Sequence, residues 1–489
     1  MSLSRPEHAA RPRKALYLTA LLVVTNFLVV FDGLVVTVAL PTVQRGFDMS
    51  QVGAQWVMTA YMLPLGGMLL LGGRCGDRYG RRRVLTTGLG LFTVGLMLAG
   101  LALTPWLLLV SRALQGVGAA LAVPTSFATI SSRPDAGDRD RTFAAVAVAG
   151  GLGAAGGAVV GGAVIQGLGW RYVFLLSVPV AACAFLSAPK LLPGHRPRGH
   201  PDGLDLPGAA LSVAGLMILV YGIAGVEHAG LASPVVLGSL AGSVLVFLMF
   251  ISHERKAAAP LIRPEVLRVP SFRTSALAMP ANEFSYQGTV FIGLLFFQQA
   301  LGYSPLAAGL AFCPLGIVVL AGSPLTKLLL RRYRWTIIAS CAQFLSAGGF
   351  VLLALASPSA RYVPHILPGL LILGLGTVVG AVTFNVAAGK DLSANEKGVG
   401  YGLFETAKYV AGVLAIACLG SIAAARTAHM DAADQATALA AGYRLAFLVA
   451  AGIAVLGGLV TVLLGDDQKG SASERPGTVR ASRSRRDVS

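Results

Sequence analysis

"ALYLTALLVVTNFLVVFDGLVVTVAL" (residues 15–40) is almost entirely apolar and exceeds the about 20 residues that an α-helix needs to cross a bilayer. One residue does not fit this pattern. Asp32 lies inside the run, where a carboxylate costs roughly 2.5–3.5 kcal/mol at mid-membrane on insertion scales. Such an acid needs a partner or a function, and the rest of the chain has to supply it.

The composition of the whole chain places it in the membrane. Its 489 residues are 55% hydrophobic and 12% charged, with a mean hydropathy of +0.71, whereas a soluble domain carries about 25% charged residues. Apolar runs of similar length recur along it. They predict an all-α polytopic membrane protein with fourteen spans, at about 15–40, 51–72, 84–103, 106–130, 142–166, 171–189, 207–226, 233–251, 274–300, 305–326, 335–356, 363–388, 398–425 and 441–464.

The basic residues predict the orientation of these spans. The net charge is +17, and with a cytoplasmic N-terminus 32 of the 39 Lys and Arg residues lie in cytoplasmic segments, with only Arg112 and Lys408 inside spans. Because cytoplasmic loops of membrane proteins are enriched in Lys and Arg, both termini are predicted to be cytoplasmic. The positive charge is therefore interpreted as topology and contact with anionic membrane lipid, and no nucleic-acid partner is expected.

The lengths of the connections divide the spans into a 6 + 2 + 6 arrangement. Long, basic, Pro-rich connections flank the seventh and eighth spans, and six spans remain on either side. Two six-helix halves are typical of transporters built from repeats. We expect a first half at 1–188, a linker with two extra helices at 189–273, a second half at 274–465 and a disordered cytoplasmic tail at 466–489.

Catalytic and metal-binding motifs are not found. The sequence has no HExxH, GxSxG or P-loop pattern, and its five cysteines form no CxxC pair. We therefore expect neither an enzyme nor a cofactor, metal site or disulfide, and no cleavable signal peptide. Transport would have to be driven by an ion gradient or by the gradient of the substrate.

A basic connection after the second span has a distinctive pattern, "GRCGDRYGRRR" (73–83). Gly73 and Gly80 allow a tight turn and a close helix approach, and Asp77 can accept hydrogen bonds from arginines or helix N-termini across an interface. The alternative is a loop that only sets topology. That alternative accounts for the arginines, including Arg78, Arg81 and Arg82, but not for Asp77 between two glycines.

The fifth span contains glycines four residues apart. Gly153, Gly157 and Gly161, with Gly162 beside them, predict close packing of two membrane helices. The same segment contains "GLGAAG" (151–156), formally a dinucleotide-binding pattern. That pattern is meaningful only between a strand and a helix, so nucleotide binding is rejected here.

Polar residues in other spans are candidates for a substrate cavity or for hydrogen bonds between helices. In the second half Glu405 and Lys408 are three residues apart on one helix face, so they could neutralise each other or, with Glu283, contact substrate. Arg112 in the fourth span could form a static ion pair, and Gln115 lies one turn away. The candidate cavity residues are Asn26, Glu283, Gln298, Asn385, Glu405 and Lys408.

Five segments together resemble the major facilitator superfamily, in particular its fourteen-span drug:proton antiporters. The loop at 73–83 resembles motif A, "SRALQGVGAA" (111–120) motif B and "GAAGGAVVGG" (153–162) the antiporter motif C, with Ala158 where Pro is usual. "DGLVVTVALP" (32–41) resembles the first-helix motif, with Leu34 and Thr37 departing from it. "GWRYVFLLSVP" (169–179) resembles the block that opens the sixth span.

The resemblance implies residue roles. It places Arg112 near Asp32 for proton coupling, gives motif A (Gly73, Asp77, Arg78, Gly80, Arg81, Arg82) a gating role, and assigns Gln115 and Gly116 to the motif B network. The implied function is a monomeric proton-coupled antiporter in the bacterial cytoplasmic membrane, whose partners are protons and small amphipathic compounds such as drugs or antibiotics. Two alternatives remain: a nutrient importer or uniporter, and a non-transporting membrane sensor.

Overall fold

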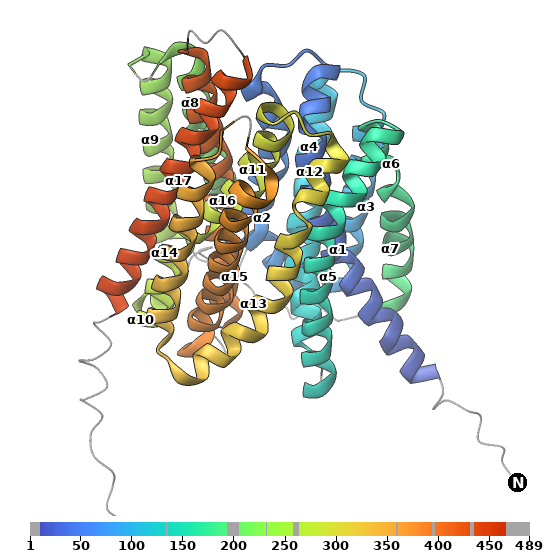
Figure 1. The fold of residues 1–489 in the computed structure, drawn as a ribbon. Helices are drawn as coiled ribbons and strands as arrows, with labels where there is room; N and C mark the ends of the chain where they lie inside the picture. Colours follow the sequence, from blue (N-terminus) through green and yellow to red (C-terminus); the bar gives the residue numbers. More distant parts are fainter. Residues whose placement is uncertain are drawn as a thin grey trace, which may run out of the picture.

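A computed structural model describes residues 10–133, 135–192, 205–230, 232–257, 264–357, 360–393, 397–430 and 435–465. Every regular element within these ranges is a helix, and the long helices run side by side in one bundle (Figure 1). The tail predicted to be disordered, 466–489, lies outside the described residues, as do 193–204 and 258–263 of the linker.

The first six predicted spans are all helical, and we refer to them together as the first half. The second predicted span is longer than expected, because the helix continues through Gly73 and Asp77 and ends only at Gly80. Pro41 likewise does not end the first helix, which runs on to Gly46. The helices are α1 (Ala10–Gly46), α2 (Gln51–Tyr79), α3 (Arg81–Gly100), α4 (Pro105–Ser131), α5 (Ala136–Gly167), and α6 (Arg171–Leu175) with α7 (Ser177–Leu191) as the sixth span.

The extra pair consists of α8 (Leu206–Ala229) and α9 (Pro234–Lys256). Helix α8 packs on α2 and α16, at the boundary between the halves, and α9 packs on α8. Asp205 caps α8 by accepting from Gly208 N (2.8 Å), and it pairs with Nε2 of His253 on α9 (2.6 Å). Burial raises the pKa of Asp205, but the bonds from Gly208 and His253 outweigh it and hold that pKa below its ordinary value.

The second half contains α10 (Pro270–Gln287), the π-helical turns η2 (Gly288–Ile292) and η3 (Phe296–Ala300) on either side of α11 (Gly293–Leu295), and then α12 to α17. A short 3₁₀ turn, η1 (Pro264–Arg268), precedes it, and η4 (Tyr362–Ile366) is a further π turn. The remaining helices are α12 (Pro305–Ala311), α13 (Cys313–Arg332), α14 (Trp335–Ala354), α15 (Leu367–Lys390), α16 (Lys397–Ala428) and α17 (Gln435–Gly465).

Thirteen helices in the described part of the chain are long and apolar enough to span a membrane. The predicted span at 274–300 is the fourteenth segment. It is helical from Pro270 to Ala300, but its two π turns divide it into shorter elements. This all-helical architecture agrees with the fold class predicted from the sequence. The start of α1 and the end of α17 lie at the same end of the bundle (Figure 1).

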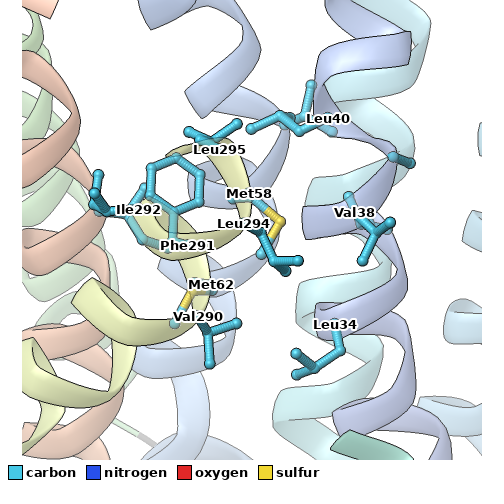
Figure 2. Packing of buried hydrophobic residues seen from close by; sticks show 14 of the residues in the cluster. Leu34, Val38, Leu40, Met58, Met62, Val290, Phe291, Ile292, Leu294 and Leu295 are labelled. Carbon is cyan, nitrogen blue, oxygen red and sulfur yellow. The ribbon is translucent and has the colours of Figure 1, made fainter. Parts of the chain in front are cut away.

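Buried apolar side chains of α1, α2 and the ninth span pack together where the two halves meet, and we call this cluster the apolar plug. Figure 2 shows Leu34 and Val38 of α1 and Met58 of α2 facing Phe291 and Leu294 of the interrupted ninth span. Helix α2 also packs on α16, and α5 packs on α12. On the outside of the bundle, by contrast, many large apolar side chains are exposed, as expected for surfaces that face lipid.

Candidate functional site

Small residues on α4 bring it close to α2. The helix begins at Thr104, whose hydroxyl accepts from Leu107 N, and Pro105 takes the first helical position. A methyl group added at Gly116 would overlap the carbonyl oxygen of Tyr61 on α2. The glycine therefore allows the two backbones to approach closely, and this places the side chain of Arg112 directly against α2.

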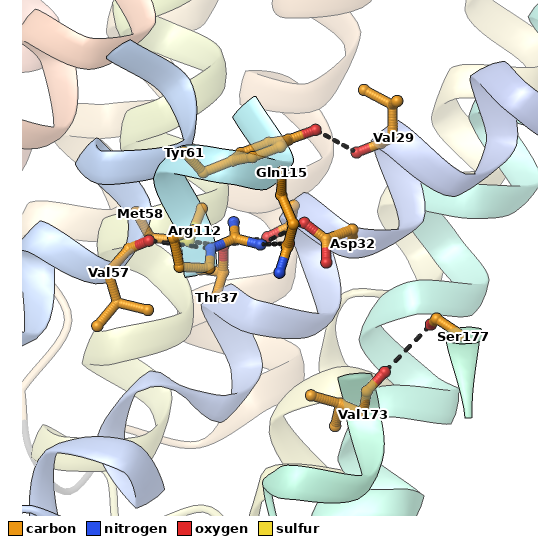
Figure 3. Close-up of polar contacts among 11 residues, drawn as sticks. Val29, Asp32, Thr37, Val57, Met58, Tyr61, Arg112, Gln115, Val173 and Ser177 are labelled. Carbon is orange, nitrogen blue, oxygen red and sulfur yellow. Dashed lines mark hydrogen bonds and ion pairs between the residues drawn. The ribbon is translucent and has the colours of Figure 1, made fainter. Parts of the chain in front are cut away.

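Arg112 and Asp32 form a buried ion pair (Figure 3). Nη1 of Arg112 lies 2.5 Å from Oδ2 of Asp32, and the two side chains are 0% and 4% exposed. The same Nη1 donates to Oε1 of Gln115 (2.5 Å), and Nε donates to the carbonyl oxygen of Val57 (3.1 Å). The pair predicted by resemblance is thus formed, with Gln115 in its network, and it joins α1, α2 and α4.

Tyr61 completes the surroundings of the arginine. Its ring lies 4.3 Å from the Arg112 guanidinium carbon, a cation–π contact, and its hydroxyl donates to the carbonyl oxygen of Val29 (3.4 Å). Leu34 belongs to the apolar plug, and the Thr37 hydroxyl donates to Gly33 O (2.8 Å). At these two positions, where the sequence departs from the antiporter motif, neither side chain hydrogen-bonds Asp32.

Two residues of the motif at 73–83, Asp77 and Arg81, form an ion pair and a hydrogen bond within the first half. Gly80 has φ of 91°, a conformation that favours glycine, and it forms the turn between α2 and α3. Asp77 is 66% exposed and pairs with Arg81 on the same side of the molecule, at 3.8 Å. Arg81 also donates to the carbonyl oxygen of Ala128 at the end of α4 (2.9 Å).

The close helix approach expected at Gly73 lies elsewhere. A Cβ added at Gly73 would meet Pro124 at 3.8 Å, an ordinary contact, whereas one added at Gly72 would overlap the carbonyl oxygen of Ala120. The prediction for Gly73 was therefore wrong in this respect, because the face of α2 that meets α4 carries Gly72. Two arginines of the motif remain. The Arg78 guanidinium lies 5.9 Å from the centre of the Tyr79 ring, and Arg82 is exposed.

The glycines of α5 serve two different contacts. Gly153, Gly157 and Gly161 pack on α1, where added methyl groups would lie 3.0–3.3 Å from its atoms. Gly162 faces the other half, and a methyl group there would lie 2.5 Å from the carbonyl oxygen of Pro305, at the start of α12. Gly309 of α12 in turn packs directly on the carbonyl oxygen of Ala158.

Two acids and a lysine inside the spans of the second half, Glu283, Glu405 and Lys408, lie near one another. Lys408 pairs with Glu405 at 2.6 Å, so these two residues do neutralise each other. Glu283 is 7% exposed and accepts from Nε2 of Gln287 (3.2 Å). Beside Gln287 and Glu283 lies Gly412 of α16. The three charged residues therefore form a cluster between α10 and α16.

The other candidate cavity residues do not join this cluster. Asn26 donates to Ser126 Oγ (2.9 Å) and to Leu22 O (2.8 Å), and so ties α1 to α4. Asn385 donates to Ala381 O within its own helix (2.9 Å). Gln298 reaches across the halves and donates to the carbonyl oxygen of Val38 (3.1 Å).

Two further polar groups lie outside the set of candidate site residues. Arg133, which the charge pattern treats only as a topological charge, places Nη1 within 2.7–2.9 Å of Oδ2 of Asp138 and of the hydroxyl oxygens of Thr142 and Thr19. The second group joins Gln299 to Gln44 and Tyr443 across the two halves. Neighbouring glutamines in an apolar span were the available signal, but the partners of Gln299 are 255 and 144 positions away.

The sequence matches the model of the family described as "Major Facilitator Superfamily" over residues 22–416. The chain is 35% identical over 469 residues to a puromycin resistance protein of Streptomyces alboniger, with 92% of each chain covered. It is 36% identical over 450 residues to a cephamycin export protein of Amycolatopsis lactamdurans, covering 90% of this chain and 89% of that one.

Solved structures show the same fold. A POT family transporter superposes with a TM-score of 0.68 at 14% identity, covering 94% of this chain and 99% of that one. A bacterial homologue of the human lysosomal transporter Spinster, in an inward-facing and unoccupied conformation, gives 0.65 at 16% identity, covering 93% and 97%. At these identities the similarity concerns the fold alone.

Proposed function

This chain belongs to the major facilitator superfamily, and on that premise we propose that it exports small amphipathic compounds in exchange for protons. Its relatives include antibiotic resistance and export proteins, which supports export of drugs or antibiotics. It is a multi-pass membrane protein, and we place it in the bacterial cytoplasmic membrane as a monomer, with protons and the exported compound as its partners.

The buried pair of Asp32 and Arg112 is the observation that carries the proposal. A proton on Asp32 removes one charge of the pair, and Arg112 is then left with the uncharged Gln115 and Val57 carbonyl. Leaving one charge of a buried pair without its partner costs about 3–5 kcal/mol. Protonation would therefore disfavour this arrangement of α1, α2 and α4 and favour another, which is how a proton biases an alternating-access equilibrium.

The proton gradient across the membrane supplies the free energy for the exchange of proton and substrate. One charge crossing the membrane is worth about 2.3 kcal/mol per 100 mV. We propose that Asp77 and Arg81 act at the cytoplasmic side of the molecule, where the two halves close in one state of the transport cycle. Asp77 is largely exposed here, so it is free to accept hydrogen bonds from the other half when that side closes.

Uptake into inverted membrane vesicles tests the proposal. We expect vesicles that contain the protein to accumulate puromycin or the fluorescent cation ethidium when the pH gradient is present, and to lose this accumulation when nigericin collapses the gradient. Asp32→Asn should abolish the response to the gradient, because the asparagine cannot take up a proton.

Asp48→Asn is the matched control. Asp48 is exposed just beyond α1, and its φ of 51° is one that asparagine tolerates, so this variant should behave like wild type. If accumulation in wild type and in Asp32→Asn is equally insensitive to nigericin, proton antiport is wrong, and transport along the substrate's own gradient becomes the better description.

A further inference from the structure

Two neighbouring glutamines, Gln298 and Gln299, form hydrogen bonds across the two halves, outside the Asp32 site. Gln299 donates from Nε2 to Oε1 of Gln44 (3.1 Å), and its own Oε1 accepts from the hydroxyl of Tyr443 (2.5 Å). The adjacent Gln298 donates to the carbonyl oxygen of Val38 (3.1 Å). Gln44 and Val38 belong to α1 in the first half, whereas the other three residues belong to the second.

A π-helical turn presents both glutamines to α1. They lie in η3, where Leu301 N donates to Phe296 O, five residues back (3.1 Å). Such turns are rare and are frequently found at functional sites. The two acceptors are six residues apart on α1, about 9 Å along its axis, so the turn is fastened at two separate points.

An aromatic wall behind the turn makes this placement rigid. Phe296 packs against Tyr443 and Phe447, with ring centroids 6.2 and 5.7 Å apart, and Phe297 packs against Phe312 at 5.3 Å. Tyr443 is fully buried, so its hydroxyl holds the Gln299 amide in a fixed orientation toward α1.

These hydrogen bonds lie near the predicted external end of the molecule. Gln44 is in the last turn of α1, which begins at the predicted cytoplasmic side, and Tyr443 lies in the first half of α17, which ends there. The apolar plug of Figure 2 lies on the same two elements, α1 and the ninth span. In this part of the molecule the two halves are in contact, and the bonds made by Gln298 and Gln299 are hydrogen bonds within that contact.

We propose that Gln298 and Gln299 form an amide clamp that holds the external side of the two halves closed, and that opening toward the exterior requires its hydrogen bonds to break. The inference rests on the alternating-access export proposed above. It assigns a positioning role to residues that contact neither Asp32 nor Arg112. Loss of the clamp should favour the externally open state and raise its ratio to the closed state about tenfold, as expected for two lost hydrogen bonds.

The distance between spin labels tests this without substrate. Leu103 and Leu355 are exposed just beyond the ends of α3 and α14, one in each half, and are replaced by labelled cysteines. The native cysteines are first removed: Cys75, Cys183, Cys313, Cys341 and Cys418. In lipid nanodiscs, pulsed electron paramagnetic resonance should show a longer-distance population that grows in the Gln298→Leu/Gln299→Leu variant.

Single variants separate the clamp from general packing. Gln44→Leu removes the same bond from the α1 side and should open the molecule as Gln299→Leu does, whereas Tyr443→Phe, which leaves the Gln299–Gln44 bond, should have a smaller effect. Gln166→Leu is the matched control, because this glutamine is exposed near the end of α5. Distances in the double variant that equal those of the Gln166→Leu control would overturn the clamp. So would opening by Gln299→Leu but not by Gln44→Leu.

Because the measurement needs no transport, it is independent of the proposed function. A protein that shows the distance shift but no proton-coupled export would retain the clamp and lose the antiport assignment. The reverse result, proton-coupled export with no distance shift, would retain antiport and reject the clamp.

Discussion

Arg112 pairs with the buried acid and is itself held by several other contacts. Nη1 donates to Asp32 and Gln115, and Nε donates to the carbonyl oxygen of Val57 on α2. The face of the guanidinium lies against the ring of Tyr61. A planar guanidinium can do this, whereas the compact ammonium of lysine cannot. The arrangement explains why a carboxylate is tolerated in an apolar helix.

Removing one member of the pair should destabilise the protein more than removing both charges. Arg112→Met leaves Asp32 buried and unpaired, at a cost of about 3–5 kcal/mol, unless the carboxyl takes up a proton. Asp32→Asn/Arg112→Met removes both charges and should recover part of this loss. Thermal unfolding in detergent, followed by tryptophan fluorescence, measures both. A double variant that melts no higher than Arg112→Met would show that the two residues do not act as an energetic pair.

For single residues, the sequence was most informative at charged residues that lie inside apolar spans. Asp32 and Arg112 are anomalous in their spans, so each called for a partner, and the resemblance supplied the pairing. Tyr61 and the Val57 carbonyl could not be predicted. An aromatic ring and a backbone oxygen in an apolar helix carry no local signal that distinguishes them from ordinary packing.

Among the helices, α5 shows what spacing can and cannot predict. Gly153, Gly157 and Gly161 lie four residues apart and pack on one helix, α1, as the pattern predicts. Gly162 follows directly and is rotated by about 100° around the helix. It therefore faces α12 in the other half, a partner that the spacing does not identify.

Alanine at Gly162 should weaken the contact between the halves. Its methyl group would meet the Pro305 carbonyl and Leu306, parts of the backbone that cannot move aside, and overpacking of this kind costs about 1–3 kcal/mol. Gly156→Ala is the matched control, since an added methyl group there has no atom within 4 Å. Thermal unfolding should give a lower midpoint for Gly162→Ala only. Equal midpoints for the two variants would contradict the contact.

For the whole molecule, hydropathy predicted the number of apolar spans but not the contacts between helices that are distant in the sequence. Fourteen apolar runs correspond to fourteen helical segments, although the ninth is divided by π turns that hydropathy cannot detect. The contacts that join the halves, such as Gln44 with Gln299, link residues 255 positions apart. Such pairings depend on how the helices pack, and no local pattern in the chain records them.

The orientation of the bundle is the remaining prediction at this scale. Because Lys and Arg gather on one side, that side should be cytoplasmic, with Tyr333 after α13 on it and Leu103 after α3 outside. Both are exposed, at 56% and 81%. In a background without native cysteines, a membrane-impermeant maleimide should label Leu103→Cys but not Tyr333→Cys in intact cells, and the reverse in inverted vesicles. The opposite pattern would place Gln44 and the amide clamp on the cytoplasmic side, so the clamp would hold that side closed instead of the external one.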